Sequence, residues 1–382
     1  MVLIVAYYPL PEGSAGSERI KSLARLAAAA DFKPIIIGKT NGRNVRGDID
    51  GIPFIAFGDT SRLRTYLSFG KKVIAEAKKI AENDEIDAII LGTSTLLSEI
   101  QIRNYAHRNG IPLIKDVVEW YSPSQFRLGR LAFPYIEKSI SNRLVDKKRD
   151  RVIAISEYLE QHYASAGVRT IRIPIFFKQD EYSSLALHKA PGSTSIIYAG
   201  SPGKKDYLHI VIQSLFLLPH ELLDGNKLKI HLAGVSDTQV KTICNETALD
   251  YHAIEHVVEA YGRISRDEVL KLYRQSDFSI LIRDGSQRYA KAGFPSKIVE
   301  SLSMGVPPIC NFTSDLAMYL RDGQTCIEVE DCNAEACADA LKRVLELSPE
   351  KTTTMKTSAK ELATRQFNID SFVPQFREIM NS

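Results

Sequence analysis

The sequence predicts an α/β protein with two doubly wound, Rossmann-like domains. The first observation is length, since 382 residues exceed what one ordinary core holds. The second is an alternation of short apolar runs with segments of helical periodicity, which is typical of parallel sheets. The third is that each half opens on a strand, a glycine-containing loop and an amphipathic helix.

The first half begins with an apolar strand over Val2–Tyr8. A loop containing Gly13, Ser14 and Gly16 follows, and apolar residues spaced as on one helix face come next. Such a corner favours an anion, although the alternative is a tight turn with no ligand. The loop lacks the GxGxxG pattern and no acidic residue closes a second strand, so a nicotinamide dehydrogenase is disfavoured.

Further elements of this half follow from apolar runs and periodicity. We expect helices over Tyr66–Ala81 and Ser139–Lys148, and strands over Pro34–Gly38, Ile52–Phe57, Ala88–Gly92, Pro112–Asp116 and Val152–Ser156.

Asp116, Glu119 and Trp120 follow the carboxyl end of a predicted strand. Open α/β sheets bind ligands at that edge, so these residues are candidates for an acceptor-binding side. Trp120 is the only tryptophan, and it is either a platform on which a sugar stacks or a core anchor.

The segment Arg127–Arg151 is basic, with apolar and aromatic residues interleaved. It could rest on an anionic membrane surface, but Pro134 argues against one long amphipathic helix. The alternative is an ordinary surface helix. Residues 1–173 hold 26 Lys and Arg against 19 Asp and Glu, whereas the remainder holds 23 against 27. The basic first half suits an anionic surface or substrate.

Domain boundaries are predicted from composition. Residues 1–175 form the first domain, 176–194 a linker without periodicity, 195–366 the second domain, and 367–382 a final helix. We expect the last helices over Ala334–Leu347, Pro349–Phe367 and Asp370–Met380.

The second half opens with a strand over Ser195–Ala199 and the loop GSPGKK. Asp206 is predicted to cap the next helix, which carries the apolar face of residues 208–216. Glycines beside Lys204 and Lys205 at a helix N-terminus suit a diphosphate, while the alternative is a purely structural loop. Further strands are predicted over Leu228–Ala233 and Val257–Tyr261.

The stretch from Phe278 to Asn311 is predicted to form a strand, a polar loop, a helix and a strand. Pro295 suits a first helical turn, and Lys297 and Glu300 follow on one side of that helix. With Arg283 nearby, free helix N–H groups would attract an anion, and Glu300 could accept hydrogen bonds from a ribose. The alternative is that Lys297 and Glu300 form an i,i+3 surface pair.

Composition excludes several classes. No window approaches about 18 consecutive apolar residues, so no transmembrane helix is expected. The N-terminal sequence has no basic region before its apolar run and is predicted to be a strand rather than a signal peptide. The five cysteines form no CxxC pair and no histidines have zinc-site spacing, so no zinc site is predicted and we expect reduced thiols and a cytoplasmic location.

Four blocks together resemble the GT-B glycosyltransferases of the large retaining group called family 4. YAGSPGKKD at 198–206 is similar to the family's diphosphate-binding strand and loop, and RVIAISEYLEQHY at 151–163 to the end of its first domain. The other two blocks are VVEAYGRISRDEVLKLYRQSDFSILI at 257–282 and AGFPSKIVESLSMGVPPI at 292–309. The resemblance covers nearly the whole chain and implies two Rossmann-like domains facing a cleft, with the final helix over 367–382 returning to the first domain.

One position departs from the family pattern of two glutamates eight positions apart. The second matches Glu300, for which the family implies ribose binding, but the first falls on Ala292. A variant pattern, Pro-x-Lys-x-x-Glu with a preceding arginine, matches Pro295, Lys297, Glu300 and Arg283. In that variant Arg283 or Lys297 meets the sugar or the phosphate.

The resemblance implies a retaining transfer of a sugar from a nucleotide diphosphate sugar to an acceptor hydroxyl, on a glycan or a lipid-linked glycan. It implies catalytic roles for Lys205, Lys297, Glu300 and Arg283. The expected donor-binding residues are Gly200, Ser201, Gly203, Lys204, Lys205, Phe294, Pro295, Ser296, Lys297 and Glu300. No metal, other cofactor or nucleic-acid partner is expected. The basic charge of the first domain makes it a candidate for peripheral membrane contact. The alternatives are a non-catalytic nucleotide-sugar-binding subunit and a sugar-nucleotide epimerase.

Overall fold

The protein is described from a computed structural model that covers residues 1–11, 15–177, 193–201, 203–223 and 227–381. The chain divides into two compact units. The first unit comprises Met1–Phe176, Ala292–Phe294 and Ile369–Ser382, and the second comprises Phe177–Lys291 and Pro295–Asn368. Gly13, Ser14 and most of the predicted linker lie outside the described residues.

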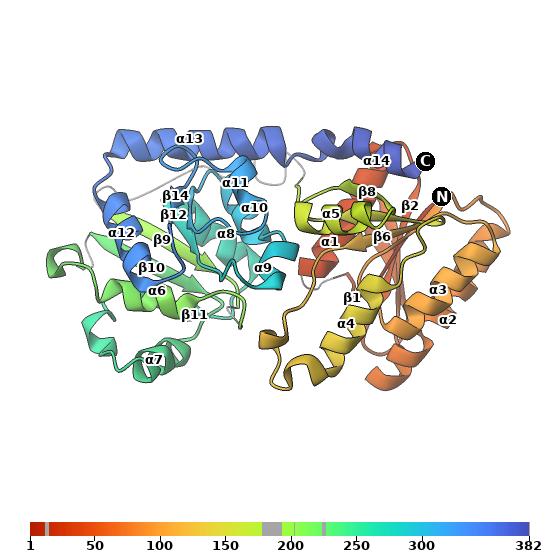
Figure 1. Cartoon of the computed structure of the whole chain (residues 1–382), viewed down its shortest axis with the longest axis horizontal. Coiled ribbons are helices and arrows are strands. Elements are labelled where there is room, and N and C mark those ends of the chain that lie inside the picture. The colour runs from red at the N-terminus through yellow and green to blue at the C-terminus, as the bar shows by residue number, and fades with distance from the viewer. Residues whose placement is uncertain (12–14, 178–192, 202, 224–226, 382) are drawn as a thin grey trace. The chain divides into compact units, whose positions relative to one another are not determined.

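The first unit is built on an eight-stranded sheet in the order β3-β4-β2-β1-β5-β6-β7-β8 (Figure 1). Its pairs are parallel except β3 with β4, which form an antiparallel edge. The strands are β1 (Val2–Pro9), β2 (Pro34–Lys39), β3 (Val45–Ile49), β4 (Ile52–Phe57), β5 (Ala88–Leu91), β6 (Leu113–Val117), β7 (Asp150–Ala154) and β8 (Arg169–Arg172).

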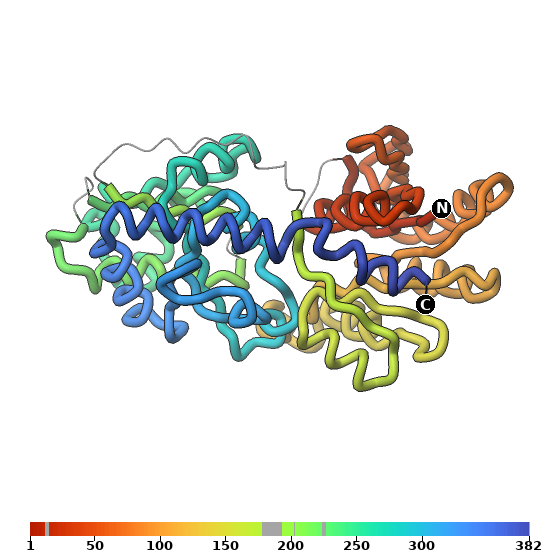
Figure 2. Tube along the Cα trace, turned by 90° about the horizontal axis from the view of Figure 1, so that it is seen from above, coloured from red at the N-terminus to blue at the C-terminus, as the bar shows by residue number. Residues whose placement is uncertain are grey.

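Helices cover both faces of this sheet, as buried apolar strands require. Alternate residues of β1 point to opposite faces, so Ile4 packs with one set of helices and Val5 with the other. The helices are α1 (Ala15–Ala29), α2 (Arg62–Ala81), α3 (Leu96–Arg108), α4 (Phe133–Arg143), α5 (Glu157–Ser165) and α14 (Val373–Met380). Figure 2 shows α14, at the blue end of the chain, beside the red helix α1, and Phe376 shares a core with Ile20 there.

The second unit has a six-stranded parallel sheet in the order β11-β10-β9-β12-β13-β14. Its strands are β9 (Thr194–Ala199), β10 (Leu228–Ala233), β11 (Val258–Gly262), β12 (Phe278–Leu281), β13 (Pro308–Cys310) and β14 (Ile327–Glu328). Its helices are α6 (Leu208–Leu215), α7 (Asp237–Glu246), α8 (Arg266–Gln275), α10 (Ser296–Ser303), α11 (Leu316–Tyr319), α12 (Ala334–Leu345) and α13 (Pro349–Gln366). Helix α9 (Arg288–Ala292) also belongs to the second unit, except for its last residue, Ala292, which is assigned to the first.

The strand order of the second unit reverses between β9 and β12. The chain passes from β9 outward to β10 and β11, then returns to the other side of β9 with β12 and continues to β13 and β14. Loops that leave the carboxyl ends of β9 and β12 therefore diverge, and a ligand site is expected at this point.

The strands predicted from apolar runs are present to within a few residues, but three expectations were wrong. The helix expected over Ser139–Lys148 is α4, which starts earlier because Pro134 occupies its first turn. Asp206 does not cap α6, whose N-cap residue is Tyr207. The final predicted helix is a 3₁₀ turn at Ile369–Phe372 followed by α14. The short edge strands β3 and β14 were not predicted, because their pattern is mostly polar or only two residues long.

No helix among the described residues combines the length and the apolar character that crossing a membrane requires.

Candidate functional site

The candidate site lies at the strand reversal of the second unit, and a buried carboxylate stands at its centre. Asp206 follows the loop after β9 and its side chain is 4% exposed. Its Oδ1 accepts a hydrogen bond of 2.8 Å from Arg283 Nε, and its Oδ2 is paired with Lys297 Nζ. The Tyr198 hydroxyl donates to the same carboxylate at 2.9 Å. The loop after β9, Arg283 just after β12 and the first turn of α10 thus meet at the Asp206 carboxylate.

The ionisation of this cluster follows from its charges. Burial acts to raise the pKa of Asp206, but the adjacent Arg283 and Lys297 outweigh it and hold that pKa below its ordinary value. Burial lowers the pKa of Lys297, and Asp206 opposes the change. Burial, and then Asp206, raise the pKa of Tyr198. The cluster therefore carries two cations and one anion, and its net charge is positive.

Lys297 lies across the backbone of the glycine loop. A β-carbon at Gly200 would fall 2.4 Å from Lys297 Cε and 2.5 Å from its Nζ, so a side chain there would force the end of the lysine to shift. Gly200 also has a φ of +131°, a region that L side chains rarely adopt. Lys297 Nζ is 3.0 Å from the Tyr198 hydroxyl and 4.4 Å from the centre of that ring. The lysine is held by contacts on several sides, and 22% of its side chain stays exposed.

Two further contacts fix the loops. Asn311, just after β13, accepts from the Arg283 amide at 3.0 Å and donates to the Arg283 carbonyl at 2.6 Å. The Tyr289 hydroxyl donates to the Lys205 carbonyl at 3.1 Å. The backbone after β12 and the loop after β9 are therefore both tied to neighbouring elements, which pre-positions the side chains they carry.

The rest of the glycine loop brings further positive charge. Ser201, Gly203 and Lys204 are exposed, and Lys205 is half-buried. Lys204 and Lys205 lie in the turn that ends at Asp206, directly before α6. Gly200 of this loop lies against Lys297, and Arg283 shares the Asp206 carboxylate with that lysine. Which of these residues touches a donor stays a prediction.

Glu300 lies one turn after Lys297 on α10, but the two residues do not form the surface ion pair that was the alternative for them. Its Oε1 lies 3.0 Å from Nη1 of Arg266, at the start of α8, and Lys297 is paired with Asp206 instead. The Glu300 side chain is 21% exposed and that of Arg266 is 52% exposed. The carboxylate is thus reachable from solvent, and a ribose role for it stays a prediction.

The segment before α10 divides between the units. Pro295 is the N-cap residue of α10 and Ser296 begins the helix, whereas Phe294 is buried within the first unit's portion. Ala292, at the position of the missing glutamate, is fully buried and accepts a hydrogen bond of 2.8 Å from Ser156 Oγ through its carbonyl.

Two of the described acceptor-side candidates, Asp116 in β6 and Trp120 after it, have structural partners. Asp116 is buried in an ion pair with Arg19 of α1, with 2.9 Å between Oδ1 and Nη2. Trp120 is 4% exposed, packs edge-on to His162 and has the Arg143 guanidinium 5.4 Å from its ring centre. These contacts support the core-anchor alternative for Trp120.

Gly16 and Glu119 fall close to the carboxyl edge of the first unit's sheet. Gly16 lies in the first turn of α1, where a β-carbon would clash with the Tyr8 ring at 2.2 Å. Burial raises the pKa of Tyr8 to about 12, and Glu119 and Asp116 add to the effect. Tyr8 therefore belongs with Glu119 at this edge, and sequence reasoning missed it because it is one apolar-looking residue of a buried strand.

Sequence reasoning also missed Asp206, Tyr198 and Asn311. Asp206 was interpreted as a cap, because an acidic residue before an amphipathic run is the usual signal for one. Its spacing from Lys297 and Arg283 in sequence gives no sign that the three meet. A signal was present in the strand order, since residues after β9 and β12 must converge in a doubly wound sheet.

Comparisons with known proteins agree with this architecture. Residues 185–362 match the family model described as glycosyl transferases group 1. No curated protein matches the chain in sequence. Sucrose-phosphate synthase from Thermosynechococcus elongatus superposes with a TM-score of 0.74 at 14% identity, over 100% of this chain and 98% of that one.

Two further structures are similar. Anabaena HepE in complex with UDP and glucose has a TM-score of 0.69 at 16% identity, over 100% of this chain and 99% of that one. WaaG, a glycosyltransferase involved in lipopolysaccharide biosynthesis, has a TM-score of 0.69 at 15% identity with the same coverage. The protein therefore has the GT-B fold, and the region matching the glycosyl transferases group 1 model includes the whole Asp206 cluster and Glu300.

Proposed function

We propose that the protein is a glycosyltransferase that moves a sugar from a nucleoside diphosphate sugar to an acceptor hydroxyl with retained anomeric configuration. The observation that carries this proposal is the Lys297–Asp206–Arg283 cluster at the strand reversal, beside the Gly200 loop. Its net positive charge, with Lys204 and Lys205 adjacent, suits a diphosphate, and its fixed geometry suits charge that develops during a reaction.

The donor diphosphate would lie between the Gly200–Lys205 loop and the first turn of α10. Backbone N–H groups at Ser296 and Lys297 begin that helix, and its first turn contains no acidic residue. Glu300, one turn further on, would accept hydrogen bonds from the two ribose hydroxyls. The HepE structures with UDP and with UDP-glucose make UDP the first nucleotide to test.

The proposed reaction needs no nucleophile from the protein. The bond between C1 of the sugar and the diphosphate oxygen breaks, and its electron pair leaves with the diphosphate. The acceptor oxygen bonds to C1 on the same face, and its proton passes to a diphosphate oxygen. Lys205, Lys297 and Arg283 stabilise the charge that grows on the leaving group. Because these cations neutralise the diphosphate, we propose that transfer needs no metal, and EDTA should leave the rate unchanged.

The acceptor is proposed to be a glycan or a lipid-linked glycan that meets the first unit. Tyr8 and Glu119 at the carboxyl edge of that sheet are the groups we propose to contact it. Asp116 would act there by positioning, because its carboxylate is already paired with Arg19.

The test is release of the nucleoside diphosphate from a panel of nucleotide sugars, with and without simple acceptors. We expect one donor to be turned over, and Lys205→Ala to lower the rate at an unchanged melting temperature. Nucleotide binding without turnover of any donor would instead indicate a binding subunit, as the Ala292 departure allows. Conversion of the sugar nucleotide to an isomer, without any acceptor, would indicate an epimerase.

A further inference from the structure

Helix α4 of the first unit turns its polar residues inward and its apolar residues outward. The residues it buries are Lys138, Ser141 and Asn142. Phe133, Ile136 and Ile140, spaced to share one side of the helix, are exposed instead. An ordinary surface helix has the opposite arrangement, with the apolar stripe toward the core.

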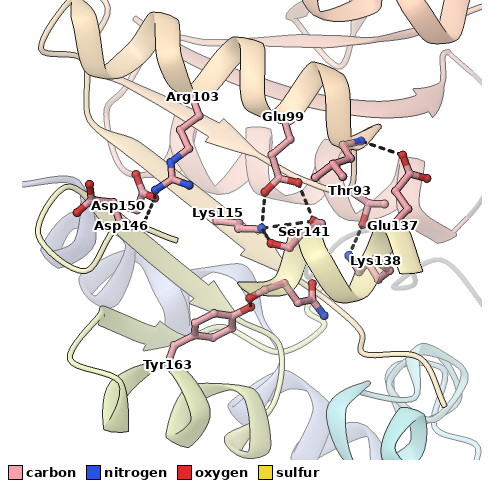
Figure 3. A network of polar contacts seen from close by, with 12 residues as sticks. Thr93, Glu99, Arg103, Lys115, Glu137, Lys138, Ser141, Asp146, Asp150 and Tyr163 are labelled. Atoms are coloured by element: carbon pink, nitrogen blue, oxygen red, sulfur yellow. Dashed lines mark hydrogen bonds and ion pairs between the residues drawn. The ribbon is translucent and has the colours of Figure 1, made fainter. Parts of the chain in front are cut away.

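The inward side of α4 is bound by specific polar contacts, which fix its orientation (Figure 3). Ser141 Oγ donates to Glu99 Oε2 at 2.6 Å, and Lys115 is paired with the same carboxylate. Lys138 Nζ donates to Thr93 at 3.2 Å, and the Tyr163 hydroxyl donates to the Asn142 carbonyl at 2.6 Å. Rotating α4 to bury its apolar side would break these buried hydrogen bonds, so the contacts hold the apolar side toward solvent.

The apolar surface extends beyond α4. The 3₁₀ turn before it, Gly129–Leu131, and the residue preceding that turn expose Leu128 at 68% and Leu131 at 78%, while Phe133 is 65% exposed. Helix α3, which packs against α4, exposes Leu97 and Ile100. Seven of the 14 large apolar side chains exposed among the described residues therefore lie on α3, on α4 or in the turn before α4, elements that contact one another. Such a concentration marks an interaction surface.

The exposed charged residues on the turns before α4 are Arg127 and Arg130. Lys147, Lys148 and Arg149 are exposed after the other end of the helix, and Asp146 beside them accepts a hydrogen bond from the Lys148 amide. The nearby carboxylates are used internally, because Glu99 is paired with Lys115 and Glu137 accepts from Tyr66 and from the Leu96 amide. Exposed apolar residues within a rim of cations are the pattern of a segment that lies on an anionic lipid surface.

We propose that α4 and its preceding turns dock the protein onto an anionic membrane surface. Leu128, Leu131 and Phe133 enter the boundary between headgroups and acyl chains, and Arg127 and Arg130 contact lipid phosphates. This inference does not depend on the transfer reaction, because binding to lipid and binding to a nucleotide are measured separately.

The test is co-sedimentation of the full chain with phosphatidylcholine vesicles and with vesicles that also contain phosphatidylglycerol. We expect binding to the anionic vesicles, weakening as salt shortens the screening length from about 10 Å at 0.1 M to about 3 Å at 1 M. Leu131→Ser with Phe133→Ser should weaken it about ten-fold or more. Arg127→Glu with Arg130→Glu should do the same.

Control variants change exposed residues elsewhere. Leu217→Ser with Met318→Ser removes exposed apolar groups of the second unit, and Lys33→Glu with Lys351→Glu reverses exposed charges. Both controls should bind as the wild type does, and all variants should keep its melting temperature. The proposal is overturned if the wild type ignores anionic vesicles or if the α4 variants bind normally. It is also overturned if light scattering shows a dimer that Phe133→Ser dissociates, since the surface would then join two copies.

Discussion

Lys297 and Gly200 are so close that a side chain at position 200 would force the lysine to move. A β-carbon at residue 200 would lie 2.4 Å from Lys297 Cε, and the lysine continues past this point to Tyr198 and Asp206. The glycine of the loop and the lysine of the helix are therefore in direct contact, although 97 positions separate them in sequence. The first prediction tests this relationship.

Gly200→Ala should displace Lys297 and weaken binding of a nucleoside diphosphate about ten-fold. The backbone at φ +131° should also cost roughly 1–3 kcal/mol of stability. Gly323→Ala is the matched control, because Gly323 has a φ of +67° and nothing within 4 Å of a β-carbon. It should lose stability without losing affinity, as measured by calorimetric titration. Equal nucleoside diphosphate affinities for the two variants would show that Gly200 is not part of the diphosphate site.

Asp206→Asn should lower the free energy of unfolding by up to about 3 kcal/mol at neutral pH, because Lys297 and Arg283 lose their shared anion. The pKa of Asp206 is lowered in the folded protein, so its stabilising effect is present above its unfolded value of about 3.9. That effect should disappear as the pH falls through the folded pKa. Urea titrations between neutral and acid pH should therefore show the difference between wild type and variant shrinking only in acid.

Glu300→Ala should weaken nucleoside diphosphate binding about ten-fold, since a charged acceptor of ribose hydrogen bonds is lost. Arg266→Ala breaks the same ion pair from the other side and leaves the carboxylate in place. Because Arg266 is half exposed, that variant should change stability by less than about 1 kcal/mol and keep its affinity. If both variants lose affinity equally, Glu300 acts through the pair and not on the ribose.

Arg19→Ala should destabilise the first unit by about 3–5 kcal/mol, because it leaves the Asp116 carboxylate buried and unpaired. Arg25→Ala is the control on the same helix, where the partner Asp50 is 57% exposed and the loss should stay below about 1 kcal/mol. Chemical denaturation measures both. Similar small losses would show that Asp116 is not held by Arg19 and is available to an acceptor.

Sequence reasoning predicted the two-unit α/β architecture because buried parallel strands such as β1 and β5 are short, almost wholly apolar runs. It located Lys297, Glu300 and the Gly200 loop because helix starts and glycine turns are local features. It missed Asp206 as the centre of the cluster, since the partners of a buried carboxylate are set by strand order and not by neighbouring residues. The inverted helix α4 was missed for the same reason, because its polar inner side is explained only by Glu99, Lys115 and Thr93 from other elements.

The most direct test of the central claim is a thermal-shift panel of the purified protein with UDP, GDP, CDP, ADP and NAD. A ligand at 100 times its dissociation constant adds about 2.7 kcal/mol to the native state, enough to raise the melting temperature by several degrees. The account predicts a shift with one nucleoside diphosphate, reduced in Lys205→Ala. A flat panel, or a shift with NAD alone, would contradict a diphosphate site at the strand reversal of the second unit.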